Sequence, residues 1–135
     1  MQRTIPYLTY EDAPAALDFL ARAFGFVERS RYPMDDGRLG HAETAYEGSS
    51  VMLASVWPEL GFMPQHALPG RSAQIVVYVD DVDAHCEQAR TAGATIIAEP
   101  RDEPHGARTY RAQDPEGHAW IFMTPPKDTA TEASE

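Results

Sequence analysis

Two stretches of this chain, YEDAPAALDFLARAFG (residues 10–25) and YVDDVDAHCEQARTAG (residues 78–93), resemble each other when the sequence is shifted by 68 positions. The identical positions are Tyr10, Asp12, Ala16, Ala21, Arg22 and Gly25 in the first stretch and Tyr78, Asp80, Ala84, Ala89, Arg90 and Gly93 in the second. Internal similarity at a fixed spacing indicates that one supersecondary unit is used twice. Each half is therefore expected to form the same succession of strands and helices.

Each repeated stretch predicts the end of a strand followed by a capped helix. Residues 5–10 mix β-branched and aromatic side chains, which favour a strand. Asp12 can cap the helix that follows, because its carboxylate accepts hydrogen bonds from free N–H groups of the first turn, and Gly25 can end it in the left-handed conformation. In the second half, residues 74–79 correspond to the strand, Asp80 or Asp81 to the cap, and Gly93 to the end.

Three extended stretches follow each predicted helix, at residues 26–32, 38–46 and 50–56 in the first half and at 95–98, 107–112 and 118–124 in the second. The prediction is an α+β fold of two β-α-β-β-β modules, whose paired curved mixed sheets enclose a cleft. We expect one domain over residues 1–126, with modules at about 3–57 and 73–125 and a Pro- and Gly-rich connecting loop at 58–72. Residues 127–135 hold no large apolar side chain and are expected to form a disordered tail.

Composition narrows the possible partners. The chain has 11 Lys and Arg residues against 21 Asp and Glu, a formal net charge of −10, which argues against nucleic acids and anionic membranes. The longest apolar run covers residues 75–79, far short of a membrane span, and residues 1–10 do not form a signal peptide. The single cysteine, Cys86, fits a reducing compartment. A cytoplasmic protein is expected.

Short motifs accompany the two modules. The second half contains VDDVDA (79–84), AGA (92–94) and DPEGH (114–118), and the first contains PYL (6–8), FG (24–25) and GHAE (40–43). With the paired modules, these motifs resemble the vicinal oxygen chelate superfamily, the group of glyoxalase I, extradiol dioxygenases and the fosfomycin and bleomycin resistance proteins. The chain looks most like the small bacterial glyoxalase/bleomycin resistance members, over about residues 3–124. Such a resemblance is specific for the fold, whereas activities within one fold differ.

The resemblance implies a divalent metal with one ligand from each of four strands. Carried over by position, the four ligands fall on Ile5 or Pro6, on Glu43, on Gln74 and on Ile121. Only Glu43 and Gln74 can coordinate a cation, and divalent ions usually need three or more protein ligands. We therefore expect no metal cofactor.

His41 offers an alternative. It lies two positions before Glu43, so the period of a strand places both side chains on one face. With Gln74 they can form a three-ligand site for Zn, Ni, Mn or Fe. Otherwise His41 and Glu43 hydrogen-bond each other as a polar patch in the cleft, or lie on an exposed face. Without a metal, Glu43 is a candidate general base, unless it is paired with His41, Arg38 or Arg108.

Apolar and basic side chains are further candidates for the cleft. Trp57, Phe62 and Met63 lie where the loop meets the cleft, where they can stack on a planar ligand or else serve as core or dimer contacts. Arg108 and Tyr110 alternate along their strand, and an inward orientation places both in the cleft.

The last strand divides its side chains between two environments. Ile121 and Met123 are predicted to line the cleft, while Trp120 and Phe122 have the opposite parity and pack under the helices. Cys86 is predicted on the buried side of its helix, where cysteine behaves as a small hydrophobe.

Three functional hypotheses follow. The first is a metal-free homodimer that binds a small organic molecule, such as an antibiotic, in its clefts. The second is a metal-dependent lyase, isomerase or dioxygenase that uses His41, Glu43 and Gln74, or a ligand from a partner subunit. The third is a small homodimer whose cleft has no such role. The ligand site predicted by the first hypothesis comprises His41, Glu43, Trp57, Phe62, Gln74, Arg108, Tyr110 and Ile121.

Overall fold

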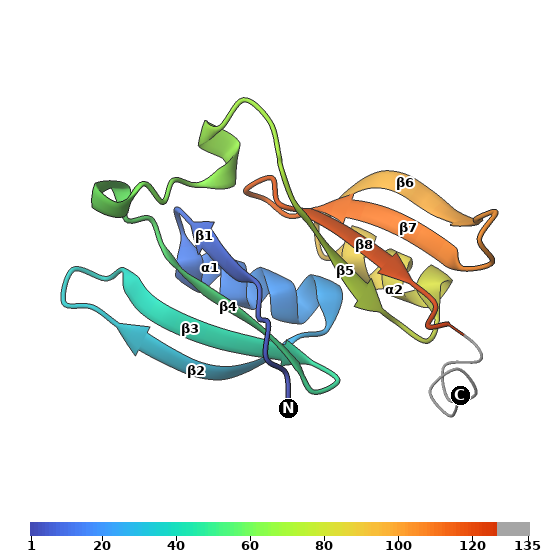
Figure 1. Ribbon diagram of the computed structural model, residues 1–135, viewed down its shortest axis with the longest axis horizontal. Coiled ribbons are helices and arrows are strands. Elements are labelled where there is room, and N and C mark those ends of the chain that lie inside the picture. The colour runs from blue at the N-terminus through green and yellow to red at the C-terminus, as the bar shows by residue number, and fades with distance from the viewer. Residues whose placement is uncertain (127–135) are drawn as a thin grey trace.

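The computed structural model describes residues 1–126, which form two four-stranded mixed sheets with a helix against one face of each (Figure 1). The predicted tail at 127–135 lies outside the described residues. The first module contains β1 (Tyr7–Tyr10), α1 (Ala13–Phe19), the π-helical turn η1 (Leu20–Phe24), β2 (Val27–Pro33), β3 (Leu39–Tyr46) and β4 (Ser49–Ser55). The connecting segment contains the 3-10 turns η2 (Pro58–Leu60) and η3 (Gln65–Ala67). The second module contains β5 (Gln74–Tyr78), α2 (Val82–Thr91), β6 (Thr95–Asp102), β7 (Arg108–Gln113) and β8 (Ala119–Met123).

The two sheets have the same topology. The strand order is β1-β4-β3-β2 in the first and β5-β8-β7-β6 in the second. In each sheet the first and last strands of the module are parallel neighbours, and the other pairs are antiparallel. The predicted α+β fold of two β-α-β-β-β modules is confirmed.

The helices begin and end at the residues that the sequence predicts. Asp12 accepts a hydrogen bond from the Ala15 N–H at 3.1 Å, and Asp81 accepts one from Ala84 at 3.0 Å, so Asp81 caps the second helix. Gly25 has φ +84°, and its N–H donates to carbonyls of the last turn of η1. No helix within residues 1–126 is long and apolar enough to cross a membrane.

Strand β6 is longer than predicted. It runs from Thr95 through Pro100 to Asp102, with two register shifts against β7. Because β6 is the edge strand of its sheet, the missing N–H of Pro100 disrupts no central ladder, and the irregular register accommodates the ring.

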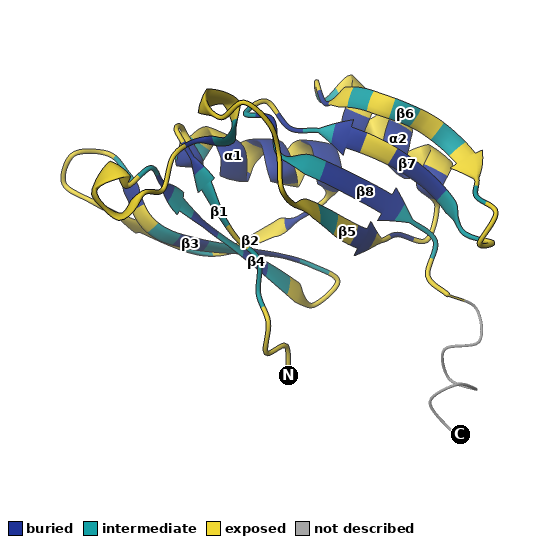
Figure 2. Ribbon diagram, turned by 45° about the horizontal axis from the view of Figure 1, so that its top comes forward, coloured by how far each residue is buried: buried dark blue, intermediate teal, exposed yellow. Residues whose placement is uncertain are grey.

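One hydrophobic core joins the two modules, and Figure 2 shows its buried residues along α1, α2 and β8. At its centre the Phe24 ring lies 4.7 Å from the Phe122 ring and 5.3 Å from the Trp120 ring, centroid to centroid. Cys86 is fully buried in the same core, as predicted. The C-terminal end of the first module's helix is therefore packed against the second module's sheet.

The Asp-Pro-Glu-Gly turn at residues 114–117 also connects the two modules through hydrogen bonds. The buried Asp114 carboxylate accepts a hydrogen bond from the Tyr10 hydroxyl at 2.6 Å. The Glu116 carboxylate accepts from the backbone N–H groups of Glu11 at 2.6 Å and Asp12 at 2.8 Å, at the start of α1. A carboxylate at this position also interacts favourably with the helix dipole.

A buried histidine forms a third link. His85 Nε2 lies 2.9 Å from the Phe24 carbonyl, and Nδ1 lies 2.6 Å from the Tyr110 hydroxyl. Only an N–H can donate to a carbonyl, so Nε2 carries a proton. Burial disfavours a second proton on the ring, so Nδ1 accepts from the Tyr110 O–H. The neutral imidazole thus forms one hydrogen bond with each module.

This arrangement predicts a pH-dependent stability. Burial lowers the pKa of His85, against a smaller opposing effect of the Phe24 carbonyl. Below about pH 6.5 the unfolded chain therefore binds more protons at this position than the folded one, and the free energy of unfolding should fall as the pH falls. Urea denaturation at about pH 5 and pH 7.5 measures the difference.

His85→Gln should remove this part of the pH dependence, because glutamine does not titrate. The matched control is His105→Gln, since His105 is exposed in the turn between β6 and β7. A wild-type slope in His85→Gln would contradict the assignment.

Candidate functional site

Each sheet has one face covered by a helix and one open face. In β8 the buried Trp120 and Phe122 belong to the core under the helices, whereas Ile121 points to the opposite face. Ile121 is only 6% exposed, and it is paired with Val76 and Arg111 across the sheet. The prediction that Trp120 and Phe122 point to one face of this strand and Ile121 to the other is confirmed. A ligand can reach the sheets at their open faces.

On the open face of the first module, His41 lies between two tyrosines. The Tyr7 hydroxyl is 2.8 Å from His41 Nδ1, and the Tyr32 ring centroid is 5.9 Å from the imidazole centroid. Tyr7 comes from β1 and Tyr32 from β2, the two edge strands of the sheet. Partial burial raises the pKa of Tyr7, so the phenol stays protonated at neutral pH. Both tyrosines were missed from the sequence, because period 2 on β1 and β2 indicates which face a side chain lies on but not that it contacts His41.

Glu43 lies on the same open face as His41 but has a different partner. Its Oε2 accepts a hydrogen bond from the Ser50 hydroxyl at 2.6 Å. None of the expected partners is its hydrogen-bond partner: His41 contacts Tyr7, Arg38 pairs with Asp36, and Arg108 is in the other module. The neighbour across the β3–β4 hairpin supplies the contact instead.

Gln74 lies on the open face of the second module. Its Oε1 accepts a hydrogen bond from Arg111 Nη1 at 3.0 Å. Arg111 was not among the predicted site residues.

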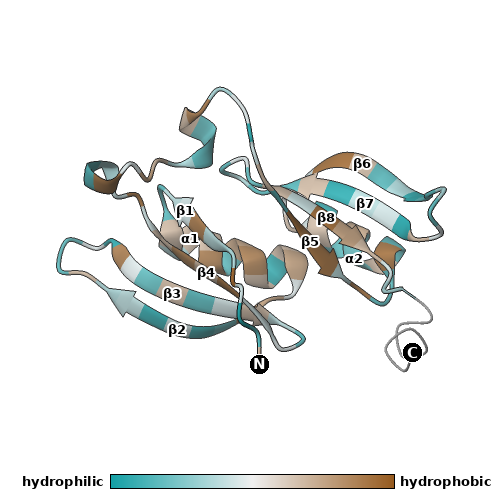
Figure 3. Cartoon of the chain, viewed as in Figure 1, coloured by the Kyte–Doolittle hydropathy of each residue, from teal (hydrophilic) through white to brown (hydrophobic). Residues whose placement is uncertain are grey.

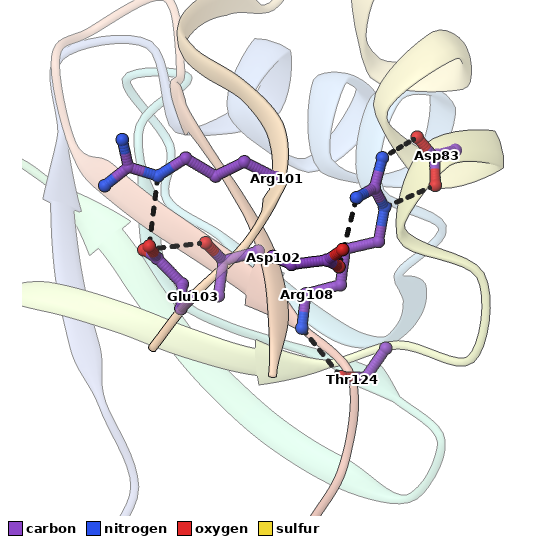
Figure 4. A network of polar contacts seen from close by, with 7 residues as sticks. Asp83, Arg101, Asp102, Glu103, Arg108 and Thr124 are labelled. Carbon is purple, nitrogen blue, oxygen red and sulfur yellow. Dashed lines mark hydrogen bonds and ion pairs between the residues drawn. The ribbon is translucent and has the colours of Figure 1, made fainter. Parts of the chain in front are cut away.

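The predicted inward orientation of Arg108 and Tyr110 is wrong. Tyr110 is fully buried on the helix-covered face, with its hydroxyl on His85. Arg108 is held between Asp83 of α2, at 2.8 Å, and Asp102 of β6, at 3.2 Å (Figure 4). Their neighbours of opposite parity, Thr109 and Arg111, occupy the open face instead.

The connecting segment and the two modules enclose a groove of about 310 Å³. Phe62, Met63 and Leu68 of the segment form one wall, and residues of β1 and β5, including Tyr7 and Gln74, form the other. Trp57 is joined to Phe62 by an isolated antiparallel bridge and is 54% exposed. Of the predicted residues, the groove therefore brings together Phe62, Met63 and Gln74. Outside its wall lie the predicted residues His41, Glu43, Trp57 and Ile121.

Two modules of identical topology, with open sheet faces and a groove between them, define a paired β-α-β-β-β protein. The family model described as Glyoxalase/Bleomycin resistance protein/Dioxygenase superfamily matches residues 4–122. The chain belongs to this superfamily, as its motifs predicted. Proteins of the superfamily bind small molecules and often form dimers.

Individual relatives are similar to this chain over most of its length. The chain is 36% identical over 126 residues to the uncharacterised protein Mb0911c of Mycobacterium bovis, covering 91% of this chain and 83% of that one. It is similar to the solved structure of TioX from Micromonospora sp. ML1, with a TM-score of 0.73, 32% identity, and coverage of 93% and 97%. A glyoxalase-related enzyme from Fulvimarina pelagi shares the fold, with a TM-score of 0.71, 22% identity, and coverage of 93% and 89%.

The residues at the family's metal positions do not fit a metal ion. Ile121 and Ile5 or Pro6 carry no donor side chain, and Glu43 and Gln74 accept hydrogen bonds from Ser50 and Arg111. A guanidinium beside Gln74 also repels a cation. Within residues 1–126 no group of three or more His, Cys, Asp or Glu side chains is placed to hold a metal.

Proposed function

We propose that this chain is a metal-independent binding protein for a small organic molecule, such as an antibiotic. The observation that carries the proposal is the groove between the connecting segment and the modules. Its wall combines exposed apolar side chains of the segment with a few polar groups, including the Gln74 amide and the Tyr7 phenol. Such a combination is typical of sites for organic ligands.

The hydrogen bonds of the three candidate metal ligands on the open faces support the metal-independent part of the proposal. Each of the three candidate ligands has a neutral or cationic hydrogen-bond partner: Tyr7 for His41, Ser50 for Glu43 and Arg111 for Gln74.

The open faces support a homodimer. Tyr7 and Tyr32 on the first sheet are 53% and 61% exposed, and Val76 and Tyr78 on the second are 50% and 53% exposed. Figure 3 shows β5 as a hydrophobic strand along most of its length. Monomeric proteins rarely leave such apolar surface uncovered, and a second copy of the chain can cover the apolar part of both faces by symmetry. As part of the same proposal, the dimer is cytoplasmic, in line with the unpaired Cys86.

Native mass spectrometry tests the proposal in one measurement. Protein purified without affinity resin or chelator should give a mass of two chains with no bound metal. A panel of aromatic antibiotics should then yield at least one saturable one-to-one adduct per chain, followed in parallel by the fluorescence of Trp57 and Trp120.

Variants locate the binding site. Phe62→Ser should weaken that adduct about tenfold, because the ring forms a wall of the groove. Leu60→Ser is the matched control, since Leu60 is as exposed as Phe62 but is not part of the wall. Stoichiometric Zn, Ni, Mn or Fe that is lost in His41→Gln and Glu43→Gln would overturn the proposal in favour of a metal-dependent enzyme.

A further inference from the structure

A second hollow of about 390 Å³ adjoins the groove on the open face of the second module. The two hollows share wall residues, among them Ser72 at the end of the connecting segment, Gln74 at the start of β5 and Ala119 at the start of β8. The second hollow differs in its charge: its wall contains Arg71 and Arg111 and no Asp or Glu. Ile97, which is 53% exposed, adds an apolar side.

Both arginines are held by neutral groups. Arg111 Nη1 donates to Gln74 Oε1 at 3.0 Å. Arg71 Nη1 donates to Gln113 Oε1 at 3.1 Å and to the Gly117 carbonyl at 3.3 Å. Neither forms an ion pair with another described residue. A guanidinium has five N–H donors, so most donors of both remain available.

Several other arginines of the chain form ion pairs with carboxylates. Arg90 lies between Glu87 and Glu99, and Arg108 lies between Asp83 and Asp102. In a chain with 21 acidic and 11 basic residues, carboxylates are the commoner partners available. Two arginines that share one hollow and contact only amides and a carbonyl therefore form a local positive site on an acidic protein.

The strand register explains how the two guanidiniums come to lie over one surface. Gln74, Ala119 and Gln113 are paired in a row across β5, β8 and β7. Arg111 lies two residues before Gln113 on β7, and thus on the same open face. The Gln74 amide orients Arg111 and the Gln113 amide orients Arg71, and neither amide cancels the charge of its arginine.

We propose that this hollow binds the anionic group, preferably a carboxylate, of an organic ligand. The apolar part of the same ligand occupies the adjoining groove. The inference rests on the proposed binding function and narrows its ligand class to organic anions. Two guanidiniums with free donors match a carboxylate, because arginine donates paired N–H bonds in the plane of such a group.

A matched pair of probes tests this inference, namely 2-naphthoate and its neutral amide, 2-naphthamide, in isothermal titration calorimetry with the dialysed protein. Naphthoate should bind at least about tenfold more tightly than naphthamide, since only its charged carboxylate can form ion pairs with the two arginines. Arg111→Gln and Arg71→Gln should each reduce the naphthoate affinity about tenfold and leave the naphthamide affinity within about twofold.

Arg22→Gln is the matched control, because Arg22 is exposed on η1, away from the hollow, and its loss changes the net charge equally. It should leave both affinities within about twofold. Thermal melting of each variant verifies that it is folded.

Three results would overturn the inference. Equal binding of naphthoate and naphthamide, unchanged in the arginine variants, would leave the proposed function intact and remove the anion site. Inorganic phosphate that binds as tightly as naphthoate and depends on the same arginines would indicate a site for a free anion. Binding of neither probe at millimolar concentration would contradict this inference and the proposed function together.

Discussion

Asp114→Ala should lower the free energy of unfolding by about 3–4 kcal/mol, because it leaves several buried donors without an acceptor. Asp114 is 2% exposed. Its carboxylate accepts hydrogen bonds from the Tyr10 hydroxyl at 2.6 Å and from Trp120 Nε1 at 3.2 Å. It also accepts from the backbone N–H groups of Glu116 at 3.1 Å and His118 at 3.0 Å. The change would thus weaken the Asp-Pro-Glu-Gly turn and a link between the modules at once.

Urea denaturation followed by circular dichroism measures this loss. Tyr10→Phe removes one of the donors and should cost less, about 1.5–2 kcal/mol, the lower part of the range for a hydrogen bond to a charged group. Asp102→Ala is the matched control, because the Asp102 side chain is 84% exposed, and it should change stability by less than about 0.5 kcal/mol. Equal effects of Asp114→Ala and Asp102→Ala would contradict the role given to the buried carboxylate.

Much of the fold was predictable because its signals are local. Asp12 and Gly25 act through their own backbone neighbourhood, and the structure places both as expected. The repeat then extended the argument from one module to the other. The predicted strand at residues 95–98 ends before Pro100, whereas β6 continues through it to Asp102. The tolerance of Pro100 depends on the edge position of β6, which is a property of the whole sheet.

The candidate site was less predictable, and β7 shows why. Hairpin pairing places Ala112 opposite Trp120 and Tyr110 opposite Phe122. Residues paired in this way point to the same face. Trp120 and Phe122 were correctly predicted under the helices, so the register across the Asp-Pro-Glu-Gly turn could have placed Tyr110 there as well. Applied to the whole hairpin, the same rule would have predicted Arg111 on the open face.

Contacts between distant residues could not have been predicted. Tyr7 contacts His41 across an intervening strand, and Arg71 reaches Gln113 from the connecting segment. These pairs depend on sheet order and on the path of the segment, neither of which has a local signature in the sequence.

Phe24→Ala should be the second strongly destabilising change, with a loss of about 3–5 kcal/mol in the free energy of unfolding. Phe24 is fully buried, and its ring lies within 5.3 Å, centroid to centroid, of Phe19, Trp120 and Phe122. The first of these belongs to its own module and the other two to the second module. A cavity here would therefore remove contacts on both sides of the junction.

The same substitution at Phe62 is the matched control. Phe62 is 55% exposed, so Phe62→Ala should cost less than about 1 kcal/mol, although it alters the groove. Stability and binding should thus respond to different phenylalanines: Phe24→Ala lowers the urea midpoint, and Phe62→Ala weakens ligand binding in a protein of nearly wild-type stability. A Phe24→Ala protein with an unchanged midpoint would show that the modules are not held together through this ring, and that the buried polar links at His85 and Asp114 carry the junction instead.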